Sequence, residues 1–138
     1  MAERTLVLIK PDGVERKLIG KIINFYEEKN LNIIAMKMTK PDLTTVEEHY
    51  IEHKGKDYFN DLIKYITEER LVAIVVEGEH AIELVRKING LTDPLNSDMG
   101  SIRGRFACDK QRNLVHASDG VDSAKREISI WFPELNNM

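Results

Sequence analysis

The chain has 138 residues, of which 42% are hydrophobic and 31% charged, and its formal net charge is −3 at pH 7. We therefore expect residues 1–138 to form one globular domain with a buried core. The acidic balance argues against nucleic-acid and membrane-surface binding, and the longest apolar run, residues 71–76, is too short to span a bilayer.

The single cysteine, Cys108, cannot form an internal disulfide, which favours a reducing compartment. We expect this thiol to be buried and unreactive. The opening residues, Met1 to Arg4, lead directly into an apparent strand and show no secretory signal peptide. Together these features predict a cytoplasmic protein.

The first third of the chain predicts a strand, a helix and a second strand. Residues 5–9 form a buried strand, because they are apolar and partly β-branched. An amphipathic helix follows, since apolar side chains recur at helical spacing: Ile19, Ile22, Ile23 and Tyr26. Residues 31–38 form the second strand, and three of its side chains share one face: Ile34, Met36 and Met38.

The middle of the chain predicts two short helices before a central strand. Residues 44–47 have the capping-box pattern, which predicts a helix through Tyr50. A second helix carries apolar side chains at helical spacing: Phe59, Leu62, Ile63 and Ile66. Residues 71–76 are apolar on both faces, as in a strand covered on both sides.

The last third contains a long segment with no periodicity. It is preceded by a helix with an apolar stripe: Ala81, Leu84, Val85 and Ile88. Residues 89–112 predict a functional loop, anchored by Ile102 and Phe106. Residues 113–116 predict a short strand. A final helix, ended by Pro133, has this inner stripe: Val121, Ala124, Ile128 and Trp131. This order of elements predicts one sheet covered by helices, of class α/β or α+β.

The chemistry is concentrated around His116, which lies between an amide and a hydroxyl–carboxylate pair in the run Asn113 to Asp119. Imidazole is a competent nucleophile near neutral pH, and a neighbouring acceptor can fix its tautomer. The preceding residues, 103–112, are rich in arginine and lysine. This combination favours chemistry on an anionic substrate, most simply phosphate. The remaining histidines carry no such motif, so we expect them to be structural or surface residues: His49, His53 and His80.

The run 113–119, followed by residues 123–128 and Trp131-Phe132, resembles the active-site signature of nucleoside diphosphate kinases. The resemblance extends from Lys10-Pro11-Asp12-Gly13 to Pro133. It implies an α+β fold, a ferredoxin-like βαββαβ sandwich with a four-stranded antiparallel sheet covered by helices. It also implies ping-pong transfer of the γ-phosphate of a nucleoside triphosphate, typically ATP, to a nucleoside diphosphate through a phosphohistidine.

The resemblance assigns roles to individual residues. His116 is the nucleophile, and Glu127, oriented by Ser118, holds its second ring nitrogen. Tyr50 supports the transferred phosphate, and Lys10 binds the phosphates and the sugar 3′-hydroxyl.

The same resemblance places the nucleotide. Arg86, Thr92 and Arg103 match phosphate-binding positions, and Asn113 matches the residue that binds the sugar hydroxyl. At the base, Tyr58 stands where phenylalanine is common, so stacking should survive. Lys110 stands where valine is common, and its stem can pack on a base while its head stays in water. Leu62 lines the same slot, and Arg105 replaces a usual aspartate.

The sequence contains no CxxC or HExxH metal motif, so we predict no direct protein ligand for a metal. Mg²⁺ is expected to arrive on the nucleotide phosphates, with Asp119 reaching it through water. The resemblance also implies a homo-oligomer, either a hexamer or a tetramer.

Three other functions compete with this interpretation. A nucleotide-binding or scaffold protein would keep the fold without turnover, but the nucleophile, its acid and the phosphate ligands are all present. Nucleic-acid binding through residues 103–112 is disfavoured by the acidic chain and the lack of interleaved aromatic residues. Histidine phosphotransfer to proteins would need a docking feature that the sequence does not show.

Overall fold

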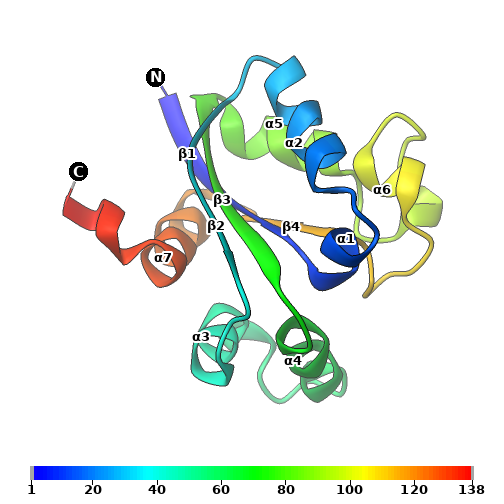
Figure 1. Ribbon diagram of the computed structural model, residues 1–138, viewed down its shortest axis with the longest axis vertical. Coiled ribbons are helices and arrows are strands. Elements are labelled where there is room, and N and C mark those ends of the chain that lie inside the picture. The colour runs from blue at the N-terminus through cyan, green and yellow to red at the C-terminus, as the bar shows by residue number, and fades with distance from the viewer. Residues whose placement is uncertain (1, 138) are drawn as a thin grey trace.

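The computed structural model describes residues 2–137; Met1 and Met138 lie outside the described residues. Its centre is a four-stranded antiparallel sheet of order β2-β3-β1-β4 (Figure 1). The strands are β1 (Ala2–Ile9), β2 (Asn32–Thr39), β3 (Leu71–Glu79) and β4 (Val115–Ala117). This confirms the expected α+β fold and places the two most apolar strands, β1 and β3, in the middle of the sheet.

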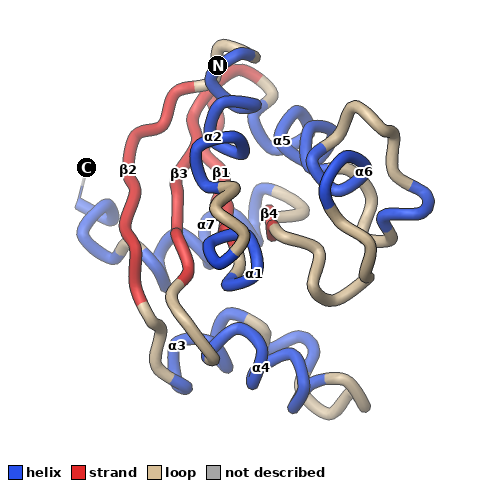
Figure 2. The backbone as a smooth tube through the Cα atoms, turned by 45° about the vertical axis from the view of Figure 1, so that its right-hand side comes forward, coloured by secondary structure: helices blue, strands red, loops and turns tan. Residues whose placement is uncertain are grey.

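Helices cover both faces of the sheet (Figure 2). They are α1 (Pro11–Glu15), α2 (Ile19–Glu28), α3 (Leu43–His49), α4 (Phe59–Thr67), α5 (Ala81–Asn89), α6 (Ile102–Phe106) and α7 (Val121–Trp131). Short 3₁₀ turns lie at η1 (Ile51–His53), η2 (Pro94–Asn96) and η3 (Pro133–Asn137). Within residues 2–137, no helix is both long enough and apolar enough to cross a membrane.

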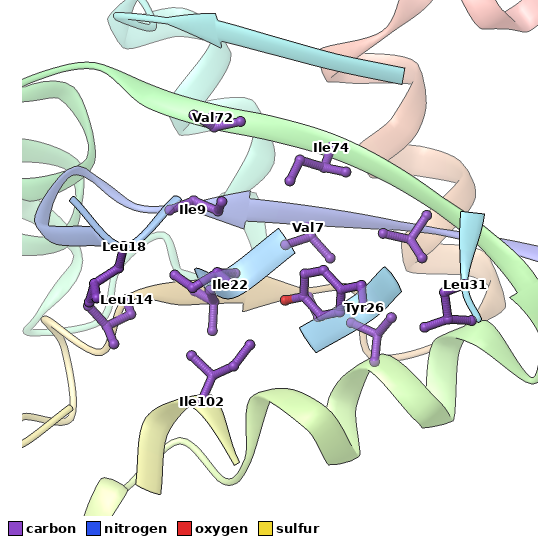
Figure 3. Packing of buried hydrophobic residues seen from close by; sticks show 14 of the residues in the cluster. Val7, Ile9, Leu18, Ile22, Tyr26, Leu31, Val72, Ile74, Ile102 and Leu114 are labelled. Carbon is purple, nitrogen blue, oxygen red and sulfur yellow. The ribbon is translucent and has the colours of Figure 1, made fainter. Parts of the chain in front are cut away.

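Alternation along β1 divides its apolar side chains between two cores. Val7 and Ile9 face α2, α5 and α6, and in Figure 3 they lie over Ile22 and Tyr26 of α2. Leu6 and Leu8 face the opposite core, which α3, α4 and α7 complete. Both cores exclude water, and their burial is the main stabilising contribution to the fold. His116 on β4 pairs with Leu8, so the expected nucleophile stands on this rigid sheet.

The helix predicted from Thr44 through Tyr50 begins earlier than expected. Asp42, not Thr44, is the N-cap, because its carboxylate accepts a 2.7 Å hydrogen bond from the Thr45 N–H. Aspartate satisfies an otherwise unpaired amide at this position. The helix therefore starts at Leu43 and ends at His49.

The segment 89–112 is less of a loop than the sequence predicts, because it contains η2 and α6. Ser101 caps α6 by accepting a 3.0 Å bond from the Gly104 N–H. A Cβ on Gly104 would clash with the Asp98 carbonyl oxygen, so only glycine fits this turn. The expected anchors do pack: Ile102 is buried, and Phe106 meets Phe25 edge to face.

Other expectations near the C-terminus need correction. The last strand starts at Val115, not Asn113, because Leu114 has a left-handed φ of 77° that breaks the extended backbone. Val121 is 53% exposed and does not belong to the inner stripe of α7. Cys108 is exposed, not buried, because it lies on the surface segment after α6.

Candidate active site

His116 projects from β4 toward α7, where Glu127 meets it. The His116 Nε2 and Glu127 Oε1 atoms are 2.8 Å apart, and the two side chains are 20% and 6% exposed. Ser118 donates to the same carboxylate oxygen at 2.9 Å and accepts a bond from the Leu6 N–H. An ionised carboxylate only accepts hydrogen bonds, so Nε2 carries the proton and Nδ1 keeps its lone pair.

The electrostatic environment keeps His116 uncharged. Burial, together with Lys10, Arg103 and Arg86, lowers the pKa of His116 to about 3. Burial raises the pKa of Glu127, while nearby His49 and the Ser118 hydrogen bond act in the opposite direction. A neutral imidazole with a fixed tautomer has the form that a nitrogen nucleophile requires.

A second histidine packs against the first. The His49 ring centroid lies 4.5 Å from that of His116, and Trp131 Nε1 donates to His49 Nδ1 at 2.9 Å. His49 is buried, and burial lowers its pKa well below the usual value. Neutral His49 therefore carries its proton on Nε2.

His49, His116 and Glu127 place ligand-type atoms within 4.8 Å of one another. A metal needs an imidazole lone pair at each histidine. The Nδ1 lone pair of His49 already accepts the hydrogen bond from Trp131, and Nε2 of His116 is directed at Glu127. The hydrogen bonds thus suit a supported nucleophile better than a metal centre.

Two adjoining cavities open beside His116, with volumes of about 160 and 440 Å³. Both are lined by the same central residues: Tyr50, His53, Thr92, Arg103 and His116. The smaller cavity also reaches charged side chains: Arg86, Asp119, Arg126 and Glu127. The larger one extends to residues of mixed character: Lys10, Tyr58, Leu62, Lys110 and Asn113. The structure thus brings together every residue that the sequence assigned to the site, with Ser118 behind Glu127.

Arg103 lies on α6, not in a loop as expected, and backbone carbonyls hold its guanidinium. It donates to Gly90 O at 2.7 Å and to Val115 O at 2.5 Å. Burial lowers the pKa of Arg103 to about 10, so it remains a cation near neutral pH. Arg86 is exposed and donates to Ala117 O at 3.3 Å. Both cations flank the nucleophile.

Lys10 and Asn113 form a buried polar pair at the floor of the larger cavity. Lys10 Nζ donates to Asn113 Oδ1 at 2.8 Å, and the Asn113 amide donates to Thr92 O and Lys110 O. Burial, with Arg103 nearby, lowers the pKa of Lys10 to about 7. This amine is therefore close to its titration point at neutral pH.

The outer end of the larger cavity is open and aromatic. Tyr58 is 44% exposed, whereas Leu62, which lines the same cavity, is buried. Lys110 keeps its head in water, with a side chain 76% exposed and Nζ 3.8 Å from Asp93 Oδ2.

Comparison with known proteins decides which family contains this site. Residues 3–136 match the family profile described as "Nucleoside diphosphate kinase". The chain belongs to the nucleoside diphosphate kinase family. A nucleoside diphosphate kinase of Clostridium perfringens is 52% identical over 96% of this chain and 93% of its own. One from Methanocaldococcus jannaschii is 51% identical over 97% of this chain and 96% of its own.

Solved structures of nucleoside diphosphate kinases have the same fold. The crystal structure of a nucleoside diphosphate kinase family protein from Babesia bovis has a TM-score of 0.93 and 44% identity, covering 96% of this chain and 90% of that one. The enzyme from Encephalitozoon cuniculi also reaches 0.93, at 35% identity, covering 94% and 88%. Family membership and fold therefore agree along nearly the whole chain.

Sequence reasoning missed that two histidines border this nucleoside diphosphate kinase site. We expected His49 and His53 to be structural or surface residues; His49 is buried and accepts a hydrogen bond from Trp131, but both also line the cavity beside His116. No motif in the sequence could have revealed them, because their positions depend on side-chain contacts with Trp131 and Tyr58. A buried support was missed as well: Asp12 accepts hydrogen bonds from Tyr65 and from the Leu114 N–H, which stabilises the left-handed turn before β4.

Proposed function

We propose that His116 carries the γ-phosphate between nucleotides as a phosphohistidine, with a nucleoside triphosphate, typically ATP, as donor and a nucleoside diphosphate as acceptor. The observation that carries the proposal is the neutral His116 imidazole, bonded through Nε2 to buried Glu127 and flanked by cations. Ping-pong transfer of this kind is the general mechanism of the nucleoside diphosphate kinase family. One pocket serves both half-reactions, because donor and acceptor are both nucleotides.

In the first half-reaction, the Nδ1 lone pair of His116 attacks the γ-phosphorus. The bond between phosphorus and the β–γ bridging oxygen breaks, and the diphosphate leaves with that electron pair. The ring becomes positively charged, and Glu127 stabilises it through the Nε2–H. In the second half-reaction, a terminal oxygen of the acceptor diphosphate attacks phosphorus, and the N–P bond returns its electrons to Nδ1.

The remaining polar side chains hold the nucleotide. Arg86 and Arg103 bind phosphate oxygens as planar forks, and Thr92 adds a neutral donor. The Tyr50 hydroxyl is buried without a hydrogen-bond partner in the described residues, which leaves it for a ligand near His116. Lys10 and Asn113 bind the phosphates and the 3′-hydroxyl of the sugar.

At the outer end, Tyr58 stacks on the base, Leu62 supports it from below, and the Lys110 stem covers the other side. These contacts engage ring faces and apolar stems, so they favour broad acceptance of bases.

Members of this family need a divalent cation, and we assign Mg²⁺. When bound with the nucleotide, the ion would neutralise charge on the phosphates. Asp119 lines the phosphate-end cavity and would hold the ion through water. Chelation with EDTA should abolish transfer, and added Mg²⁺ should restore it. Full activity in EDTA would contradict this assignment.

We also propose that the whole chain, residues 1–138, acts as one domain in a cytoplasmic homo-oligomer, a hexamer or a tetramer. Edge strand β2 supports association, because Ile34, Met36 and Met38 are 37%, 56% and 49% exposed. The exposed, unpaired thiol of Cys108 suits a reducing compartment. Light scattering should give a mass six or four times 15.9 kDa; the mass of a monomer or a dimer would contradict the proposal.

A split half-reaction tests the function. The protein is incubated with γ-labelled ATP and Mg²⁺, isolated, and then given GDP. We expect acid-labile, base-stable label on the protein, its complete transfer to GTP, and no label on His116→Ala. Tight ATP binding without labelled protein would instead indicate a nucleotide-binding protein that lacks turnover.

A further inference from the structure

A hydrogen bond joins η1 to the start of α4 at the rim of the larger cavity. His53 Nδ1 lies 2.6 Å from the Tyr58 hydroxyl. The intervening residues turn tightly, with Lys56 N–H donating to His53 O at 3.1 Å. The side-chain bond therefore closes a short loop whose backbone is already ordered.

His53 stands between the two ends of the nucleotide site. Its ring centroid is 5.6 Å from that of Tyr58 and 5.9 Å from that of Tyr50. It lines both cavities, whereas Tyr58 lines only the larger of those two. Its contact with Tyr58 thus connects the phosphate end to the base end.

Tyr58 needs such a partner because its ring is otherwise weakly restrained. It is 44% exposed, and it occupies the N-cap of α4 without a side-chain capping bond. If such a side chain must lose its conformational freedom when the ligand binds, the entropy cost weakens affinity by about twofold to tenfold. An aromatic ring that is already fixed in its binding orientation avoids most of that cost.

We propose that His53 is a positioning residue that fixes Tyr58 as a stacking platform before the nucleotide binds, and so sets the affinity for the base. This rests on the proposed function, in which Tyr58 stacks on the base. This positioning requires the tyrosine hydroxyl, because phenylalanine would present the same ring without the hydrogen bond to His53. A tyrosine hydroxyl both donates and accepts, so either neutral tautomer of His53 maintains the contact.

The effect should depend on the base and not on the phosphates. Stacking strengthens with the size of the aromatic face, so purines should benefit more than pyrimidines. A sugar triphosphate without a base should gain nothing from the platform.

Steady-state kinetics of His53→Leu, Tyr58→Phe and the double variant test the proposal with ATP, CTP and ribose 5-triphosphate as donors. Each single variant should raise the KM for ATP about threefold to tenfold, raise that for CTP less, and retain kcat at saturation. Because both changes remove the same bond, the double variant should match the single ones. His53→Asn, whose side-chain amide occupies the position of the Nδ1 atom that bonds the Tyr58 hydroxyl, should restore most of the affinity.

The outcomes separate this inference from the proposed function. Labelling of His116 at saturating γ-labelled ATP should persist in all variants. If the native protein itself showed no label, the proposed function would be rejected, and not the role of His53. An unchanged KM for Tyr58→Phe, or additive effects in the double variant, would overturn the role of His53. An equal rise in KM for ribose 5-triphosphate would show that His53 acts on the phosphates, and would also overturn it.

Discussion

Replacing Glu127 by glutamine removes one charge from the site and almost no volume. The native carboxylate accepts bonds from His116 Nε2 at 2.8 Å and from Ser118 Oγ at 2.9 Å, and it is 6% exposed. The amide retains one acceptor oxygen but loses the negative charge that balances the imidazolium. The geometry is preserved, so the change isolates the electrostatic contribution.

The strength of these hydrogen bonds sets the expected loss of transition-state stabilisation. A hydrogen bond to a charged group contributes about 1.5–3 kcal/mol, and a neutral one about 0.5–1.5 kcal/mol. The His116 bond strengthens as the ring becomes charged, and glutamine retains a neutral bond of about 0.5 kcal/mol, so the transition state should lose about 1–2.5 kcal/mol. At tenfold per about 1.4 kcal/mol, phosphorylation of His116 should slow by about fivefold to 70-fold.

Stopped-flow fluorescence can follow this step. Trp131 is the single tryptophan and donates to His49, whose ring is 4.5 Å from that of His116, so its emission should report phosphorylation. Glu52→Gln is the matched control for the loss of one carboxylate from the same cavity. Arg126 Nη2 lies 3.9 Å from Glu52 Oε1 and 3.7 Å from Glu127 Oε2, so it keeps its contact with Glu127 in this variant. A native phosphorylation rate in Glu127→Gln, or an equal slowing in Glu52→Gln, would refute the reasoning.

Three further predictions concern charge, backbone space and packing. With its pKa lowered to about 7, Lys10 loses its proton as pH rises, so kcat/KM for ATP should fall between pH 7 and 9; a flat native profile would contradict this. Lys10→Arg should flatten that profile, because arginine stays charged. Gly104→Ala should lower both Tm and kcat/KM, since the new Cβ meets the Asp98 carbonyl and displaces the helix that carries Arg103; native values in both assays would reject the clash. Ile22→Ala should cost about 2–5 kcal/mol of unfolding free energy in urea titration, because Ile22 is fully buried; a loss below about 1 kcal/mol would contradict this packing.

Local patterns predicted the elements that bury most apolar surface. Residues 71–76 are apolar on both faces, and the strand they form pairs on both sides. The helix at 102–106 was missed because it is short and contains Gly104, which weakens any helical pattern. Strand order was not readable from periodicity, because pairing of β1 with β4 joins residues more than a hundred positions apart.

The residues of the candidate site that belong to a sequence motif were predicted. The residues that only tertiary contacts bring to the site were missed. His116 and Glu127 lie in one short signature at the end of the chain. The position of His49 depends on Trp131, 82 residues away, so no local pattern reveals it. His53 acquires its role from a single bond across a turn.

The pairing of Leu8 with His116 also constrains how the molecule reaches its native state. The ribosome synthesises β1 early and β4 late. The edge of β1 that pairs with β4 therefore stays unpaired while most of the chain is synthesised. Contacts this distant in sequence slow folding, because a long loop must close before they form. Until β4 pairs with β1, His116 is not fixed beside Glu127 in the nascent chain. Catalytic activity should therefore appear abruptly and late, together with the native structure.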